Sequence, residues 1–167
     1  VPWSKREQTL SQLQSWRING KIAVNTGHDS GSATLNWAQY RQQYTISLLG
    51  PLGANSMRLS GGPGHVTMTT GDGKQFSAAS AEQLLAQHWG FNLPVSSMQY
   101  WIRGMPVPGI PSNSRFDSYH RLSDLTQQGT HIQYLDYTNR YGMELPQRIY
   151  ITAPSITAKI VIYEWNT

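Results

Sequence analysis

The residue types needed for catalysis are few in this chain, and their spacing does not form an established catalytic constellation. His28, Asp29 and Ser30 have the residue types of a hydrolase triad, but they are consecutive. A Ser–His–Asp relay requires side chains that converge from separate elements. Gly27 and Gly31 flank the three residues and indicate a tight turn instead. We therefore expect no catalysis from this motif.

Metal binding and acid–base chemistry have equally little support in the sequence. The chain has no cysteine, which excludes thiolate-ligated zinc and disulfides. The histidines lack the short spacings of paired metal ligands; they are His28, His65, His88, His120 and His131. The acidic residues Asp117, Asp124, Asp136 and Glu144 offer several carboxylate pairs, and nothing in their spacing selects one of them. We predict a protein that is not an enzyme and that has neither a metal site nor a cofactor.

The segment around Leu52 offers an apolar contact with a lipid or a partner instead of catalysis. An apolar run ends at Leu49. A turn is predicted directly after it, from Gly50, Pro51 and Gly53. The residue at the tip of that turn is nevertheless a leucine. Leu52 either folds back onto the core or is held out toward a partner or a membrane.

The elements that position these residues are mostly short strands. Apolar and polar residues alternate in short runs between residues 18 and 68, and turn segments such as 27–31 and 61–64 separate these runs. Strands are predicted again over 115–125, 131–138, 147–152 and 157–165. Helical spacing predicts helices at 3–16, 80–91 and 95–103. We predict a mainly β (α+β) fold in one domain over residues 1–167, with a single curled antiparallel sheet and helices on its concave face.

Strand alternation and helix faces direct nine large apolar side chains toward a common interior. They are Leu35, Trp37, Ile46, Leu48, Met57, Leu59, Trp89, Met98 and Trp101. They either pack as a core or line a cavity for an apolar ligand. Methionine and tryptophan side chains suit an adaptable apolar ligand such as an acyl chain.

The charge of the chain excludes further functional classes. Thirteen Lys and Arg against nine Asp and Glu give a net charge of +4, and only 13% of the residues are charged. The basic residues are scattered, so we expect no nucleic-acid partner. No apolar run approaches the ~18 residues of a membrane-spanning helix.

Several motifs, taken in order, resemble those of the LolB family of outer-membrane lipoprotein receptors. The segment 13–24 runs from a helix into a strand, and the segment 48–53 has the sequence Leu-Leu-Gly-Pro-Leu-Gly. A later segment matches the family pattern W-[IL]-x-G-x-P, with Trp101, Gly104 and Pro106 at its fixed positions. The resemblance covers nearly the whole chain and is clearest over residues 10–106.

This resemblance implies a half-barrel of about eleven strands, covered by a lid of about three helices, with an apolar cavity for acyl chains. The nine interior residues would line that cavity, and Pro51, Leu52 and Gly53 would form the membrane-insertion loop. It further implies that a LolA-type carrier delivers lipoproteins and that the protein, as a monomer, inserts them into the inner leaflet of the outer membrane.

Members of the family begin with a lipid-modified cysteine, whereas this chain has none. We expect it to be the mature part of a protein anchored on the periplasmic face of the Gram-negative outer membrane. The alternative is a periplasmic binding module for a small hydrophobic ligand or an envelope lipid, with no role in insertion.

Overall fold

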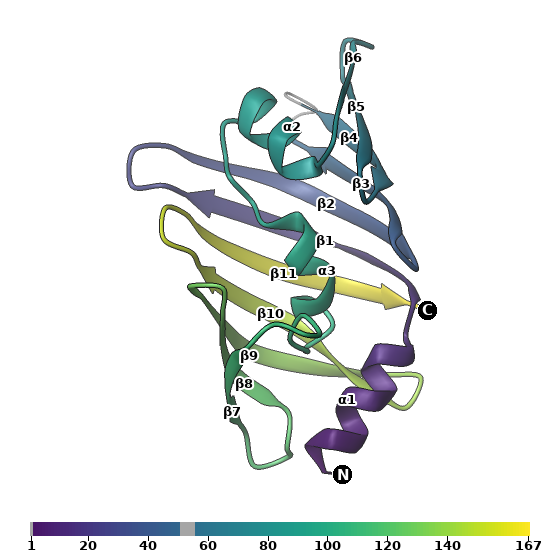
Figure 1. Cartoon of the computed structure of the whole chain (residues 1–167), viewed down its shortest axis with the longest axis vertical. Coiled ribbons are helices and arrows are strands. Elements are labelled where there is room, and N and C mark those ends of the chain that lie inside the picture. The colour runs from purple at the N-terminus through teal and green to yellow at the C-terminus, as the bar shows by residue number, and fades with distance from the viewer. Residues whose placement is uncertain (1, 51–55) are drawn as a thin grey trace.

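The computed structural model describes residues 2–50 and 56–167, and its elements are labelled in Figure 1. The helices are α1 (Trp3–Gln12), α2 (Ala81–His88) and α3 (Val95–Trp101). The strands are β1 (Ser15–Asn25), β2 (Ser30–Tyr40), β3 (Gln43–Leu49), β4 (Met57–Gly62), β5 (His65–Thr70), β6 (Gln75–Ala78), β7 (Ser112–Phe116), β8 (Leu122–Gln127), β9 (Thr130–Arg140), β10 (Met143–Thr152) and β11 (Thr157–Asn166).

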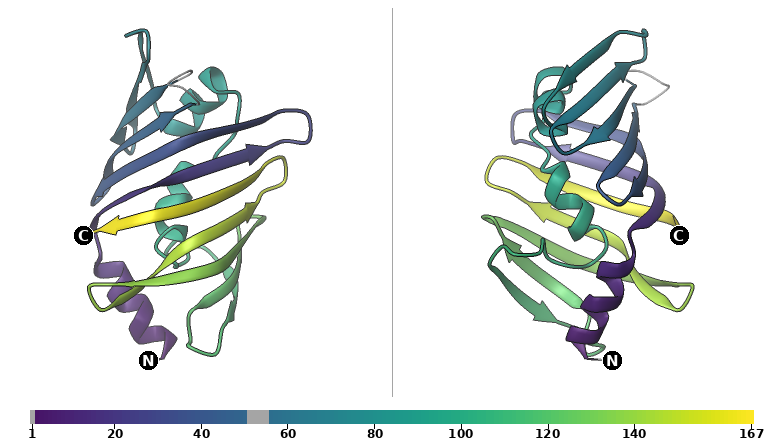
Figure 2. Two further views of the ribbon diagram at one scale, coloured as in Figure 1. Left: turned by 180° about the vertical axis from the view of Figure 1, so that it is seen from behind. Right: turned by 45° about the vertical axis from the view of Figure 1, so that its right-hand side comes forward.

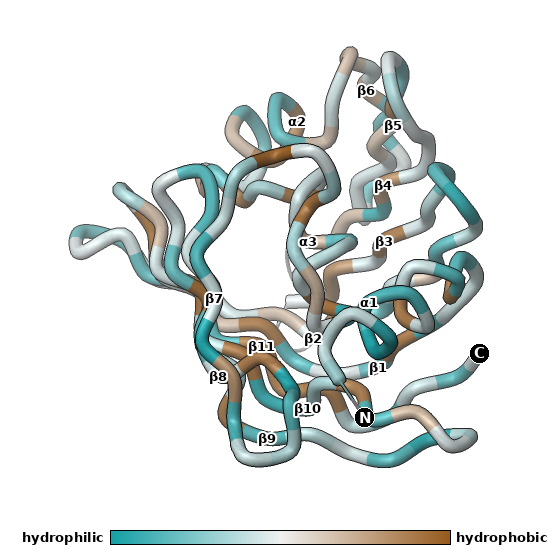
Figure 3. The backbone as a smooth tube through the Cα atoms, turned by 60° about the horizontal axis from the view of Figure 1, so that its bottom comes forward, coloured by the Kyte–Doolittle hydropathy of each residue, from teal (hydrophilic) through white to brown (hydrophobic). Residues whose placement is uncertain are grey.

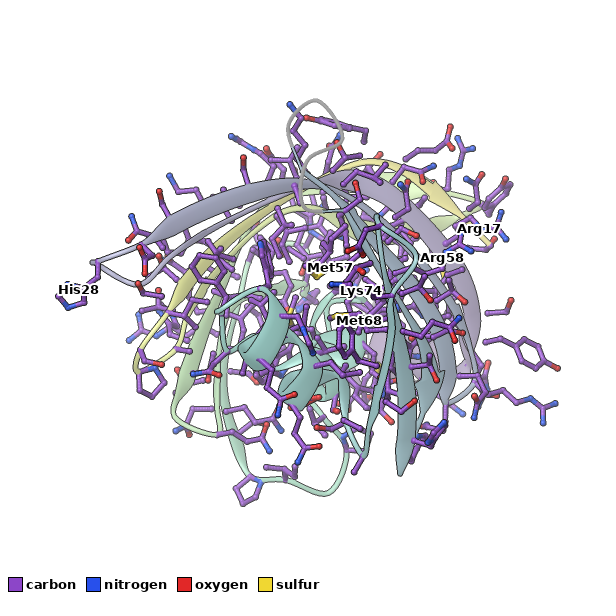
Figure 4. The ribbon with its side chains drawn as sticks, turned by 90° about the horizontal axis from the view of Figure 1, so that it is seen from above. Arg17, His28, Met57, Arg58, Met68 and Lys74 are labelled. Atoms are coloured by element: carbon purple, nitrogen blue, oxygen red, sulfur yellow. The ribbon has the colours of Figure 1, made fainter. Side chains whose placement is uncertain are left out.

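Within those residues the eleven strands form one antiparallel sheet, in the order β6-β5-β4-β3-β2-β1-β11-β10-β9-β8-β7. Consecutive strands pair with each other, except that β6 and β7 lie at the two edges of the sheet. The first and last strands, β1 and β11, pair at its centre. The sheet curves into an arch, and α2 and α3 lie against its concave face (Figures 2 and 4). The predicted fold, a single curled sheet with three helices, is confirmed.

The alternation of apolar and polar residues explains the two faces of this arch. In β1, Trp16, Ile18, Ile22 and Val24 are buried, while the residues between them are mostly exposed. Since successive side chains of a strand point to opposite faces, the apolar ones all lie on the concave side. The hydropathy colouring shows apolar positions recurring along the strands (Figure 3). The core therefore lies between the sheet and the helices.

The first helix is shorter than its predicted range of 3–16. It ends at Gln12, and Ser15 already begins β1. Trp16 fits the apolar face of a helix that includes Leu10 and Leu13, but it also begins the alternation that continues through Ile18. Pairing with β2, in which Trp16 lies opposite Gln39, decides in favour of the strand.

The predicted strand over 115–125 is also wrong, because the chain turns back within it. β7 ends at Phe116, and β8 begins at Leu122. The Asp117 carboxylate accepts hydrogen bonds from the backbone N–H groups of Tyr119 and Arg121, at 2.9 and 3.0 Å. This aspartate-based turn gives two short strands in place of one.

The helices inserted between β6 and β7 lie close to their predicted ranges, 80–91 and 95–103. The Ser80 hydroxyl caps α2 by accepting a hydrogen bond from the Gln83 N–H. The helix ends at His88, and Gly90 has a positive φ of 85°. The Glu82 carboxylate accepts hydrogen bonds from the Ser96 N–H and hydroxyl, at 3.3 and 3.2 Å. This contact joins α2 to α3.

Candidate functional site

The strand register places the predicted interior residues side by side on the concave face. Leu48 pairs with Leu35 on one side and with Met57 on the other. A parallel row runs from Trp37 through Ile46 and Leu59. In Figure 4, Met57 lies beneath the arch. Directly opposed residues on one face have Cβ atoms about 5 Å apart, so these six side chains form a continuous apolar surface.

The helices add the remaining three predicted residues to this surface. Met98 and Trp101 of α3 are buried against the core. Trp89, which directly follows α2, is only partly buried and packs at the edge of the core. The nine residues thus share one interior, and eight of them are buried in it.

Trp89 lines an open cleft of about 740 Å³ at one end of the arch. Its apolar lining includes Phe91, Val24, Ala33 and Leu48. The rings of Trp89 and Phe91 meet edge to face, with their centroids 5.0 Å apart. This cleft gives solvent access to the edge of the apolar interior.

A buried chain of amide hydrogen bonds holds α3 to β2. Trp37 Nε1–H donates to Gln39 Oε1 at 2.8 Å, and Gln39 Nε2–H donates to Gln99 Oε1 at 3.0 Å. Gln39 and Gln99 are only 3% and 8% exposed. Because buried polar groups are costly when unpaired, this chain of bonds favours one position of the helix on the sheet.

A second set of hydrogen bonds holds the other end of α3 to β8 and β9. Gln127 Oε1 accepts from Trp101 Nε1–H and from the Val107 N–H, at 2.9 and 2.8 Å. The Tyr134 hydroxyl donates to the Trp101 carbonyl at 2.6 Å, and burial raises the pKa of Tyr134 well above its usual value. The hydroxyl therefore stays protonated and remains a donor at neutral pH.

Arg103 connects α3 to α1. Its guanidinium donates to the carbonyls of Leu10 and Leu13, at 3.3 and 2.8 Å, and to the carbonyl of Gln99 at 3.1 Å. Burial lowers the pKa of Arg103, but an arginine remains charged at neutral pH. Its charge faces the carbonyl end of α1, where a cation is favoured.

The polar residues considered for catalysis or metal binding form separate pairs rather than one cluster. His131 Nε2 lies 2.9 Å from Asp124 Oδ1 on the neighbouring strand. His28, Asp29 and Ser30 lie at the turn between β1 and β2, where Asp29 N–H donates to Thr26 Oγ1 at 3.0 Å. Asp117 and Glu144 both pair with Arg121, at 2.8 and 2.9 Å. Over residues 2–50 and 56–167, no three His, Asp or Glu side chains are grouped as metal ligands, and no helix is long and apolar enough to cross a bilayer.

Comparison with known proteins identifies the family. Residues 14–165 match the family described as outer membrane lipoprotein LolB. The chain belongs to the LolB family. Curated LolB proteins of Pseudomonas putida strain W619 and Pseudomonas syringae pv. syringae are each 39% identical to it, over 98% of this chain and 80% of theirs. The resemblance seen in the motifs is therefore confirmed.

Solved structures share the fold of this LolB-family chain at low sequence identity. A LolA-superfamily protein from Nitrosomonas europaea has a TM-score of 0.63 at 10% identity, with coverage of 99% of this chain and 93% of that protein. A DUF1329-family protein from Desulfovibrio piger has a TM-score of 0.66 at 8% identity, with coverage of 98% and 91%. This chain thus shares its fold with these two solved structures.

The predicted insertion loop of this LolB-family chain, with Pro51, Leu52 and Gly53, lies outside the residues that the structure describes. The flanking elements are described: β3 ends at Leu49, and β4 begins at Met57. The role of Leu52 therefore stays a prediction.

Sequence reasoning missed Phe91, which lines the cleft. It also missed the residues whose hydrogen bonds hold the lid helices, namely Gln39, Gln99, Gln127 and Arg103. One signal was present for Gln39, because it continues the inward series Ala33, Leu35, Trp37 by one more step of two. A glutamine at an inward strand position indicates a buried hydrogen-bond partner.

Proposed function

We propose that this LolB-family protein receives lipoproteins from a LolA-type carrier, holds their acyl chains on its apolar inner face and inserts them into the outer membrane. Family membership supports a role in outer-membrane lipoprotein sorting. The observation that carries the finer proposal is the continuous apolar surface beneath α2 and α3, which pack on it through buried apolar side chains and a few buried hydrogen bonds. Leu48, Met57 and Trp101 belong to this surface.

The energetics of acyl chains explain why such a surface is needed. Each methylene moved from water into an apolar environment contributes ~0.8 kcal/mol, so a sixteen-carbon chain exposed to water costs about 12 kcal/mol. Contact with the inner face removes most of that cost. Transfer needs no bond chemistry if the carrier, this protein and the bilayer hold the chains with increasing affinity.

The lid helices must move for acyl chains to enter. The space under α3 is filled by side chains that are at most 2% exposed, such as Met98 and Trp101. The open cleft at Trp89 and Phe91 is the place where a chain tip first reaches apolar surface. Because Glu82 bonds to Ser96, α2 and α3 would leave the sheet together.

A substitution of Leu48 tests the acyl-binding surface. Leu48→Asn places an amide at the junction of the cleft and the inner face, so the uptake of lipoprotein from the carrier should fall severalfold. Thr34→Asn, on the exposed outer face of β2, is the matched control. Equal uptake by the two variants would refute a lining role for Leu48. A co-purified small lipid without any lipoprotein uptake would favour the alternative of a small-ligand binding module.

Leu52 is proposed as the residue that enters the membrane. A single leucine contributes only ~1.5–3 kcal/mol on burial, so it orients the protein on the bilayer rather than anchoring it. Leu52→Glu should leave receipt from the carrier intact and block release into liposomes, because a carboxylate resists entry into hydrocarbon. The two stages are assayed separately. Loss of the first stage would place Leu52 in the core, and no change in either stage would leave it a turn residue.

A further inference from the structure

The outer face of the sheet carries an isolated cation near the connection between β3 and β4. Arg58 pairs with Ser47 of β3 on one side and with Thr69 of β5 on the other. Its neighbours Met57 and Leu59 are buried, whereas Arg58 is exposed. Figure 4 shows Arg58 on the outer side of the arch, away from Met57 and Met68. The guanidinium is thus flanked by two hydroxyl-bearing side chains.

The charge of Arg58 is not neutralised within the part of the chain that the structure describes. No carboxylate of residues 2–50 or 56–167 forms an ion pair with it. The acid nearest along the chain, Asp72, accepts a hydrogen bond from Thr70 and lies 3.7 Å from the Lys74 ammonium. Asp72 therefore already has partners, and Arg58 is available to an external anion.

An apolar side chain borders this cation. Leu49 ends β3 on the same face as Ser47 and is 43% exposed. Leu49 and Arg58 line one open cleft of about 260 Å³, together with Ser47, Thr69 and Thr70. A cation, hydroxyl groups and an exposed leucine in one cleft match the parts of a phospholipid at a bilayer surface. The phosphate would meet the guanidinium and the hydroxyls of Ser47 and Thr69, because the Thr70 hydroxyl already donates to Asp72. The glycerol and upper acyl region would meet the leucine.

We propose that this cleft binds the headgroup of an anionic phospholipid when the protein docks on the membrane. The proposal rests on the proposed function, because it assigns the docking side to the sheet end at which β3 stops and β4 begins. The headgroup contact fixes the orientation of the half-barrel on the bilayer. Its electrostatic part is weak by itself and is screened by salt, which suits a protein that must release its cargo at the surface.

The test is the sedimentation of the purified chain with vesicles. One set contains phosphatidylcholine alone, and the other contains phosphatidylcholine with phosphatidylglycerol. Arg58→Gln should bind the anionic vesicles about fivefold less than the parent chain, the effect of one cation at a charged surface, and should bind the neutral vesicles equally. Arg115→Gln is the matched control, because Arg115 is exposed on β7, at the opposite edge of the sheet. Leu49→Ser should weaken binding to both sets.

Equal binding of Arg58→Gln and Arg115→Gln to the anionic vesicles would overturn the headgroup site. So would an absence of any preference of the parent chain for anionic lipid. Unchanged melting temperatures and circular dichroism establish that the variants are folded. If Leu52→Glu still delivers lipoprotein while Arg58→Gln loses the lipid preference, the insertion role fails and the headgroup site stands. If only Leu52→Glu is defective, the headgroup site alone is refuted.

Discussion

Replacing Gln39 with leucine tests whether the buried amide chain determines the position of α3 on the sheet. Leucine is similar to glutamine in size, although it branches one carbon earlier, and it neither donates nor accepts hydrogen bonds. The change removes three hydrogen bonds. Gln39 accepts from Trp37 Nε1–H at 2.8 Å, and it donates to Gln99 Oε1 at 3.0 Å and to the Arg41 carbonyl at 2.8 Å. Trp37 is 1% exposed and Gln99 is 8% exposed. Water therefore does not readily replace either partner while the helix stays in place.

The magnitude follows from Trp37 Nε1–H and Gln99 Oε1, because these two residues are buried whereas Arg41 is exposed. Each buried, unsatisfied group costs about 1–3 kcal/mol. Burying leucine in place of an amide returns about 1–2 kcal/mol of desolvation. The net loss of unfolding free energy should be about 1–4 kcal/mol, which lowers the melting temperature by about 2–16 °C for a domain of this size. Urea unfolding followed by tryptophan fluorescence measures the free energy directly.

A double-mutant cycle makes this test specific to the bond between sheet and helix. Gln39→Leu with Gln99→Leu removes both partners, so the double variant should lose at least 1 kcal/mol less than the sum of the single losses. Thr34→Leu, on the exposed face of the same strand, should change stability by no more than about 0.5 kcal/mol. A loss below 0.5 kcal/mol for Gln39→Leu, or additive losses in the cycle, would refute the role of this bond.

Three further predictions follow from other parts of the molecule. Gly20→Ala should unfold the protein, because a Cβ atom there would lie 2.0 Å from the Val161 carbonyl oxygen. Gly31→Ala is the control, because its Cβ atom would meet only side-chain atoms, the nearest in the Phe91 ring at 3.1 Å. Thermal melts should show a much smaller loss of stability for Gly31→Ala than for Gly20→Ala. Burial, and then the charge of Glu82, raises the pKa of Tyr44 from 10.0 to about 12. Its neutral form therefore stabilises the fold below pH 10, and this contribution is lost as the pH rises from 10 to 12. Tyr44→Phe should reduce that alkaline loss in urea titrations. Arg103→Met should speed amide hydrogen exchange in residues 3–12, and unchanged exchange would show that α1 docks without these bonds.

The fold could be predicted from the sequence where alternation is regular. In β2 and β3 a period of two separates buried from exposed positions almost without exception, so the inner face follows from the order of residues. Prediction failed where local and tertiary preferences compete. Trp16 fits the end of a helix and the start of a strand equally well, and only its pairing with β2 decides. The turn at Asp117 depends on hydrogen bonds to its side chain, and a hydropathy pattern does not reveal such bonds.

The candidate site divides in the same way. Its apolar surface was predictable, because Leu35, Leu48 and Met57 each occupy an inward position of an alternating strand. The hydrogen bonds that hold the helices to the sheet were not predictable. Whether Gln99 or Gln127 is buried depends on a partner that lies 60 or 26 residues away, and no local pattern contains that information. Leu49 and Arg58 line one cleft only because β3, β4 and β5 pair side by side in the sheet.

The pairing of β1 with β11 at the centre of the sheet has a consequence for how the chain folds. The strands β2 to β6 and β7 to β10 form two meanders whose contacts are local and close quickly. The central pair instead joins residues such as Asn25 and Thr157, 132 positions apart, and its closure has a much larger entropic cost. Until that pair forms, the apolar faces of the two meanders are not joined into one core. The interval before closure is thus when the chain is most prone to aggregate.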